Sequence, residues 1–148
     1  MAPGKASTSA NSETTNRSME IIRNILAVGA GSFIGGAARY LISLAMKGIG
    51  KGLQAQFQLP LATLAVNLAG CLMIGLLWGI LTRNATETTT WGLFLTVGLC
   101  GGFTTFSTFS KEALTMLQTG QILAFATYIS ISVIAGITLV ALGYYIAR

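Results

Sequence analysis

Four long stretches of hydrophobic residues follow one another along the chain, and short polar segments separate them. The stretches cover residues 25–46, 61–81, 91–110 and 122–147. Each can cross about 30 Å of hydrocarbon as a helix, which takes about 20 residues. Backbone polar groups in lipid must be hydrogen-bonded within their own segment, so each stretch is predicted to be helical. The pattern therefore predicts an all-α membrane protein with four transmembrane helices.

Residues 1–20 differ from the rest of the chain. They are polar, rich in Ser, Thr and Asn, and show no hydrophobic periodicity. Such a segment cannot bury enough apolar surface to offset the entropy of ordering it. We therefore predict a disordered polar tail over residues 1–20 and a four-helix transmembrane domain over residues 21–148.

Composition agrees with membrane insertion and excludes several functions. Hydrophobic residues make up 53% and charged residues 9%, against about 25% charged in soluble domains. The net charge of +5 comes from basic residues near the stretch ends, where they meet headgroups. They form no patch interleaved with aromatic residues, so nucleic-acid binding is not expected.

The chain has no histidine and no paired carboxylates, so an enzyme is not expected. Cys71 and Cys100 lie too far apart to indicate a zinc motif.

The distribution of basic residues leaves the orientation open. Four spans place both termini and the 81–90 loop on one side, and the 47–58 and 118–121 loops on the other. Near the membrane, the first side carries Arg17, Arg23, Arg83 and Arg148, and the second carries Arg39, Lys47, Lys51 and Lys111. The positive-inside rule then gives no preference. Either another signal orients the protein, or it inserts both ways and pairs as an antiparallel dimer.

Glycines spaced four residues apart predict close helix packing. The pairs are Gly31 with Gly35, Gly75 with Gly79, and Gly98 with Gly102. This spacing lets two helix backbones approach each other in a membrane. The contacts can form within one chain or between two chains, and the spacing does not distinguish these cases.

The third stretch contains the segment GGFTTFSTFS at residues 101–110. Two glycines followed by hydroxyl and aromatic residues are poor material for a continuous helix. We predict a break from Gly101 to Thr105, after which a threonine caps a new helix. Freed backbone groups at membrane depth mark ion sites in transporters. The alternative is a glycine kink whose hydroxyls bond back to the helix.

Aromatic and hydroxyl side chains alternate after this break. Phe106 and Phe109 are three residues apart and so share one helix face, as do Ser107 and Ser110, with Thr108 nearby. The positive edge of an aromatic ring can hold an anion without carrying charge, and hydroxyls donate hydrogen bonds. Two ordinary core phenylalanines are the alternative. The alternation favours an anion pathway.

Polar side chains in the other stretches add to this prediction. Asn67 lies in the middle of an otherwise apolar span, where a polar group is functional by default or joins two helices. Arg39 lies near the end of the first span and either reaches the interface or sets a positive potential at a pore mouth. Lys111 and Glu112 are expected to mark the aqueous end of the third span.

Three segments resemble the signatures of a known family. VNLAGCLMIG at residues 66–75 and GLCGGFTTFSTFS at residues 98–110 are similar to the two signature segments of the Fluc fluoride channels, also called the CrcB family. GGAARY at residues 35–40 is similar to the arginine segment of that family's first helix. The resemblance covers residues 22–147. It implies an antiparallel dual-topology homodimer in the cell (inner) membrane that exports fluoride passively through two pores around a central structural sodium ion.

The resemblance also implies roles for individual residues. Asn67 would donate a hydrogen bond to fluoride, and Phe106 and Phe109 would supply ring edges along each pore. Ser107, Thr108 and Ser110 would form a polar track, and the main-chain carbonyls of Gly101 and Thr104 would bind the sodium ion. Arg39 would lie at a vestibule, and Tyr128 would contact the pore.

A proton-coupled exporter of the small multidrug-resistance type is the main alternative function. Its chemistry needs a carboxylate deep in a span, whereas Glu112 lies near a span end. A non-transporting assembly subunit would leave the alternation of rings and hydroxyls unexplained.

Overall fold

The computed structural model describes residues 4–49 and 59–148, and these residues form helices and short connections with no strand. Most of the 47–58 loop, with Lys51, lies outside the described residues. The elements are α1 (Gly4–Ile49), α3 (Leu61–Arg83), α4 (Thr90–Leu93), the π-helix η1 (Phe94–Cys100), α5 (Gly101–Phe103), α6 (Phe106–Gln118) and α7 (Ile122–Ala147). The prediction of an all-helical chain is confirmed.

Four helical segments are long and apolar enough to cross a membrane. They are Glu13–Met46, Leu61–Arg83, Thr90–Gln118 and Ile122–Ala147. The first lies in α1, and the second and fourth are α3 and α7. The third joins α4, η1, α5 and α6 into one bent span. The four predicted spans are therefore confirmed, including the interruption in the third.

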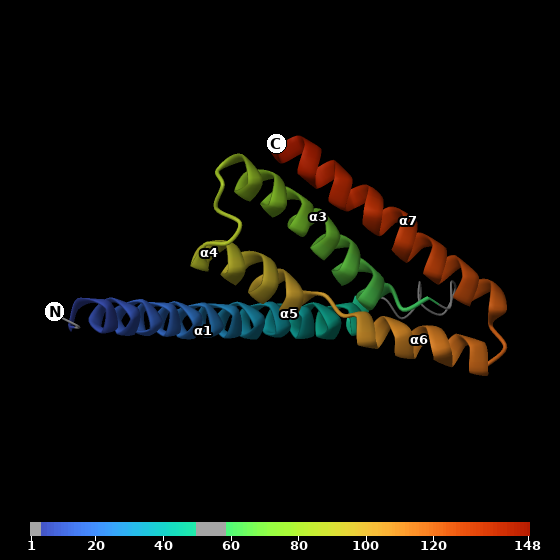
Figure 1. Ribbon diagram of the computed structural model, residues 1–148. Coiled ribbons are helices and arrows are strands. Elements are labelled where there is room, and N and C mark those ends of the chain that lie inside the picture. Colours follow the sequence, from blue (N-terminus) through green and yellow to red (C-terminus); the bar gives the residue numbers. More distant parts are fainter. Residues whose placement is uncertain (1–3, 50–58) are drawn as a thin grey trace.

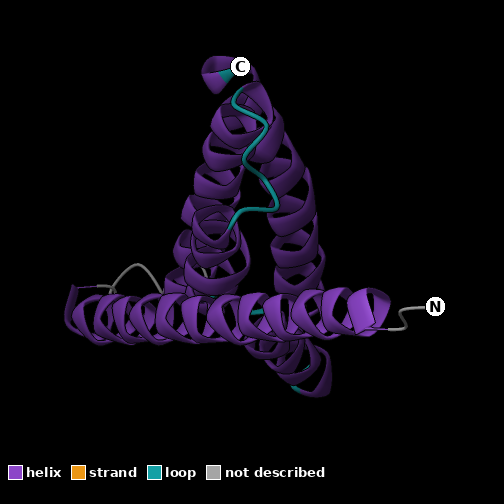
Figure 2. Cartoon of the chain, turned by 60° about the vertical axis from the view of Figure 1, so that its left-hand side comes forward, coloured by secondary structure: helices purple, strands orange, loops and turns teal. Residues whose placement is uncertain are grey.

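The helices are arranged as two close pairs. In Figure 1, α3 and α7 run side by side, while η1 and α5 lie against α1. The start of α1, the end of α7 and the α3–α4 connection lie at one end, and the α6–α7 turn lies at the other. Figure 2 shows α1 crossing in front of the other helices. This placement of loops and ends agrees with the topology predicted from four spans.

Glycines hold both pairs in close contact. A Cβ atom added to Gly143 of α7 would lie 2.6 Å from the Leu72 carbonyl oxygen of α3. One added to Gly102 of α5 would lie 2.5 Å from the Ser32 carbonyl oxygen of α1. Only a residue without Cβ lets the backbones approach this closely. All three predicted glycine pairs make such contacts within the chain, so the intrachain alternative is confirmed for them.

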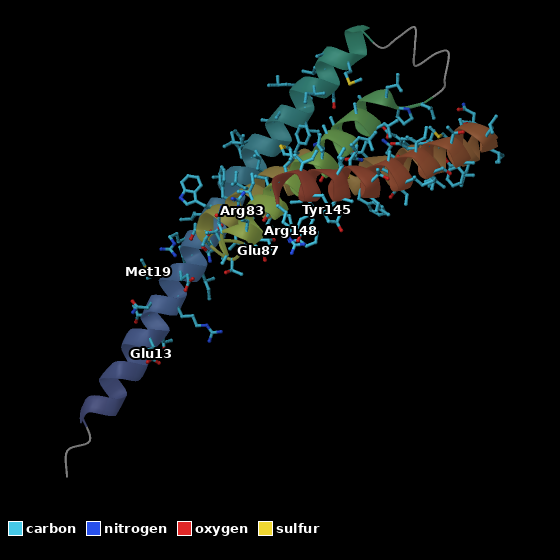
Figure 3. All side chains as sticks on the ribbon, turned by 90° about the horizontal axis from the view of Figure 1, so that it is seen from above. Glu13, Met19, Arg83, Glu87, Tyr145 and Arg148 are labelled. Carbon is cyan, nitrogen blue, oxygen red and sulfur yellow. The ribbon has the colours of Figure 1, made fainter. Side chains whose placement is uncertain are left out.

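The N-terminal part of α1 differs from the prediction. The sequence predicts a disordered tail over residues 1–20, whereas the structure has one continuous helix from Gly4. Figure 3 shows Glu13 and Met19 on a part of this helix that projects beyond the other helices. Side chains from Glu13 to Ile22 are exposed. The helical hydrogen bonds here therefore extend from the packed span, since propagation needs no new nucleus. The domain boundary at residue 20 stays a prediction.

Candidate functional site

The third span is interrupted at two consecutive threonines. Helix α5 ends at Phe103, and the backbone of Thr104 (ψ 160°) and Thr105 (φ −148°, ψ 111°) is extended. Helix α6 begins at Phe106, and the Thr105 hydroxyl caps it by accepting a 3.3 Å hydrogen bond from the Thr108 amide. The predicted break and threonine cap are confirmed. The break is shorter than predicted because Gly101 and Gly102 are helical.

Asn67 of α3 replaces the hydrogen bonds that the break removes. The Thr105 amide donates to Asn67 Oδ1 at 2.8 Å, and Asn67 Nδ2 donates to the Thr105 carbonyl at 3.1 Å. One carboxamide thus satisfies both backbone groups of the extended residue. The prediction that Asn67 joins two helices is confirmed. A carboxamide carries two N–H donors, and only one is needed for this pair, so donation to an anion stays a prediction.

The same hydrogen bonds change the environment of two carbonyl groups. In a continuous α-helix the Thr105 amide would bond to the Gly101 carbonyl, and the Thr108 amide to the Thr104 carbonyl. Both amides donate elsewhere, to Asn67 and to the Thr105 hydroxyl. The carbonyls of Gly101 and Thr104 therefore lack their helical partners. Such oxygens suit hard cations, and Gly101 is exposed with open space beside its Cα.

A cavity of about 430 Å³ lies at the break. Its lining comes from α3, η1, α5, α6 and α7, and it includes Asn67, Thr96, Gly101, Thr104, Thr105, Phe106, Phe109 and Ser132. The structure thus gathers five of the predicted site residues around one space. The other five, Ser107, Thr108, Ser110, Tyr128 and Arg39, do not line it.

Three aromatic rings follow one another from this cavity into the bundle. The ring centroids of Phe106 and Phe109 are 5.7 Å apart, and those of Phe109 and Tyr128 are 5.0 Å apart. Exposure falls along the series: Phe106 is 79% exposed, Phe109 is half-buried and Tyr128 is fully buried. The shared face predicted for the two phenylalanines is confirmed, and Tyr128 extends it.

The hydroxyl groups after the break behave in two ways. The Thr105 hydroxyl donates to the Thr108 hydroxyl at 3.0 Å and lies 3.4 Å from the Ser107 hydroxyl. These three form a connected polar row. Ser110 instead donates to the Phe106 carbonyl of its own helix at 2.9 Å, which is the back-bonding alternative. A polar track through Ser107, Thr108 and Ser110 stays a prediction.

Glu112 contributes to this region in a way that the sequence prediction missed. Its two carboxylate oxygens accept 2.8 Å hydrogen bonds from the Thr63 hydroxyl of α3 and the Tyr128 hydroxyl of α7. Glu112 is half-buried, whereas its neighbour Lys111 is exposed. A carboxylate turned into the bundle thus joins three helices. Its spacing of three residues from Phe109 was the signal, because it places both side chains on one face.

Arg39 lies on a second, smaller cavity. This space of about 170 Å³ is lined by Arg39, Tyr40, Ser43, Thr63, Val66, Thr105 and Thr108. Thr105 lines both cavities, so the extended residue separates the arginine from the aromatic side. A positive charge therefore lies close to the polar row. The vestibule role of Arg39 stays a prediction.

Comparison with known proteins places this arrangement in a family. Residues 26–144 match the family described as CrcB-like protein, Camphor Resistance (CrcB). The chain belongs to the CrcB-like family. The break, Asn67 and the rings all lie within the matched part of this multi-pass membrane protein, and the projecting part of α1 lies outside it.

Several curated proteins similar to this CrcB-like chain are named "Fluoride-specific ion channel FluC". The one from Flavobacterium psychrophilum is 41% identical over 127 residues, which cover 86% of this chain and 98% of the relative. That from Desulfotalea psychrophila is 39% identical over 130 residues, covering 88% and 96%. That from Chlorobium phaeobacteroides is 38% identical over 124 residues, covering 84% and 92%. The chain thus spans nearly the whole length of these relatives.

Proposed function

We propose that this chain forms a fluoride-selective channel through which fluoride leaves the cell passively, across the cell (inner) membrane. The relatives are named as fluoride-specific channels, and the fold supplies a suitable site. The observation that carries the proposal is the break, where Asn67 and the rings of Phe106 and Phe109 line one cavity. Fluoride formed inside from its neutral acid would flow out down its gradient, which lowers cytoplasmic fluoride.

The chemistry of the break suits a small, strongly hydrated anion. Removing fluoride from water costs several kcal/mol unless donors replace the water. Neutral N–H and O–H donors, together with positive ring edges, can replace it without a fixed charge that would trap the ion. Conduction needs sites that are favourable but shallow. The free N–H of Asn67 and the edges of Phe106 and Phe109 would form such sites.

The remaining predicted residues would line the rest of the route. Ser107, Thr108 and Ser110 would offer hydroxyls beyond the rings, and Tyr128 would continue the aromatic series. Arg39 would raise the local concentration of anions at one mouth, because positive potentials attract them. Ser110 would have to release its bond to the Phe106 carbonyl before it could contact the ion.

The working unit would be an antiparallel dual-topology homodimer with two pores. Phe106 is 79% exposed although it borders the cavity at the break, so a single chain leaves the pathway open along one side. A second copy would close it. The glycine pairs are occupied within the chain, so the dimer would use the surface around the break. The even division of basic residues supports insertion in both orientations.

Labelling of one exposed loop tests this topology. Asn84→Cys, introduced together with Cys71→Ala and Cys100→Ala, places the only thiol in the exposed α3–α4 connection. In intact cells an impermeant maleimide should label about half of the protein, and the remainder should react after permeabilisation. Labelling that is complete, or absent, before permeabilisation would refute dual insertion.

A sodium ion would join the two copies at the break. The carbonyls of Gly101 and Thr104 lack their helical partners, and two chains would together supply oxygen ligands for a hard cation. When bound, the ion would hold the two breaks in register. A ligand that binds only the folded dimer raises its unfolding temperature. Sodium chloride, but not potassium chloride at equal ionic strength, should therefore raise the temperature at which the dimer dissociates. Equal shifts would refute the site.

Efflux from vesicles tests the channel itself. Purified protein in liposomes loaded with potassium fluoride should release fluoride when valinomycin is added, and parallel vesicles loaded with chloride should retain it. The Asn67→Asp variant keeps the acceptor for the Thr105 amide but adds a charge that repels anions, so it should release fluoride far more slowly. A wild-type protein that releases no fluoride, or chloride equally fast, would refute the proposal.

A further inference from the structure

An open groove runs along the outer face of the α3–α7 pair. It encloses about 600 Å³, and its lining includes Trp78 of α3 with Ser132, Ile137, Val140, Tyr144 and Tyr145 of α7. Most of the lining is apolar. From Ser132 to Tyr145 the groove follows α7 for about 20 Å, at 1.5 Å per residue. One leaflet of the hydrocarbon core is about 15 Å thick, so the groove is long enough to hold a lipid acyl chain.

One end of this groove is aromatic and basic. The rings of Trp78 and Tyr144 have centroids 4.7 Å apart, and Tyr145 meets Tyr144 edge-on at 5.5 Å. The guanidinium carbon of Arg148 lies 5.6 Å from the centre of the Tyr144 ring. Figure 3 shows Arg83, Tyr145 and Arg148 close together, near the ends of α3 and α7. Rings of this kind favour the level of the headgroups, which places the arginines beside lipid phosphates.

The neighbouring acidic side chain leaves these arginines available. Glu87, in the α3–α4 connection, accepts a hydrogen bond from the Thr82 hydroxyl. Arg83 and Arg148 are both exposed, and Arg148 N lies 3.2 Å from a Cβ atom built on Gly79, one helical turn from Arg83. Arg83 and Arg148 therefore lie at adjacent helix ends.

We propose that the α3–α7 groove is a binding site for one anionic phospholipid. Its acyl chain lies along Ile137 and Val140, and its phosphate contacts Arg83 and Arg148 above the Trp78–Tyr144 rings. A second copy of the chain is the other candidate occupant. Charge complementarity favours the lipid, because a copy packed here would bury two like-charged arginines against an apolar helix. The groove reaches the cavity at the break at Ser132, whereas the aromatic and basic end that would hold the phosphate lies away from the break.

Tryptophan fluorescence tests the site directly. The chain has two tryptophans, so Trp91→Phe leaves Trp78 as the only one. This variant is placed in phosphatidylcholine vesicles that contain a fixed fraction of either brominated phosphatidylglycerol or brominated phosphatidylcholine. Bromine quenches tryptophan on contact. The quenching should correspond to a preference of about fivefold or more for the anionic lipid, as expected for each basic residue near a phosphate.

Matched variants separate the outcomes. Adding Arg83→Gln and Arg148→Gln should remove the preference while brominated phosphatidylcholine still quenches Trp78. Arg17→Gln, which removes an exposed arginine from the projecting part of α1, should leave the preference intact. Equal quenching by both lipids in the parent, or a preference that survives the double substitution, overturns the proposal. No quenching by either lipid means that a second copy covers the groove, which also overturns it.

Discussion

Helix α3 contacts its neighbours in two different ways, one on each side. Toward α7 it presents glycines, and backbone atoms meet directly: a Cβ at Gly79 would lie 2.7 Å from the Tyr144 carbonyl oxygen. Toward the third span it presents polar side chains, with Asn67 bonded to Thr105 and Thr63 bonded to Glu112. The first contact joins two continuous helices. The second joins a continuous helix to an interrupted one.

The difference follows from what each neighbour needs. A continuous helix in lipid satisfies its own backbone, so close packing alone stabilises the contact. An interrupted helix exposes amides and carbonyls, which are tolerated only where protein, water or an ion meets them. Asn67 satisfies one residue of the break and leaves the carbonyls of Gly101 and Thr104 without helical partners. The glycine contact is therefore structural, whereas the polar contact borders the cavity at the break.

The largest effect should come from filling the glycine contact. In Gly75→Leu the new Cβ would meet the Val140 backbone, whose carbonyl carbon is 2.9 Å away, so α3 and α7 must separate. We expect a loss of about 3 kcal/mol or more, seen as failure to purify a monodisperse protein by size exclusion. Gly29→Leu is the matched control, because no atom lies within 4 Å of that Cβ. Equal behaviour of the two variants would contradict the packing account.

Removing the polar contact should have the next largest effect. Asn67→Leu leaves the amide and carbonyl of Thr105 without partners, and each such buried group costs about 1–3 kcal/mol. We expect a loss of about 2–4 kcal/mol in unfolding by denaturant, together with loss of fluoride efflux. Asn67→Gln keeps the same groups on a longer side chain and should recover part of the stability. Unchanged stability in Asn67→Leu would show that the two hydrogen bonds between Asn67 and Thr105 are dispensable.

Tyr128→Phe sharpens the comparison at the second polar contact. It keeps the ring beside Phe109 but removes the hydroxyl that donates to Glu112. A hydrogen bond to a charged group is worth about 1.5–3 kcal/mol, and the remaining bond from Thr63 should limit the loss to about 2 kcal/mol. Thermal unfolding measures it. Tyr145→Phe removes a hydroxyl from a ring that is 74% exposed and should change little.

The smallest effect should come from the cap of α6. Thr105→Ala removes the hydroxyl that accepts from the Thr108 amide, and losing such a cap costs about 1 kcal/mol. Thr105→Ser should restore the cap. Thr115→Ala is the matched control on the same helix, because its hydroxyl bonds only back to the Lys111 carbonyl. A loss in Thr115→Ala as large as that in Thr105→Ala would show that the cap has no special role.

The sequence predicts those features that depend on one segment at a time. The four spans follow from apolar length, and the break follows from the run of threonines and aromatic residues. The predicted start of the break, at Gly101, lies too early in the chain, because Gly101 and Gly102 also suggest a bend in sequence but are helical in the structure. In the structure Gly102 is helical and packs directly against the Ser32 backbone of α1. A glycine that bends a helix and one that packs against a neighbour look the same in sequence.

The sequence could not predict features that depend on which helices are neighbours. The partner of Asn67 and the inward turn of Glu112 require α3, α6 and α7 to be placed in space. The projecting helix at the start of α1 was also missed, since its polar composition lacks the periodicity of a packed helix. The side chains from Glu13 to Ile22 are exposed, so burial against another helix did not require that periodicity there.

Fluoride efflux through two phenylalanine variants tests most directly whether ions pass at the break. Phe106 and Phe33 are almost equally exposed, at 79% and 77%, but only Phe106 lines the cavity. Rates should be measured in parallel liposome preparations with equal protein content. The account predicts that Phe106→Ile abolishes efflux, because an aliphatic side chain has no positive edge, while Phe33→Ile conducts like the wild type. Equal rates in the two variants would contradict it.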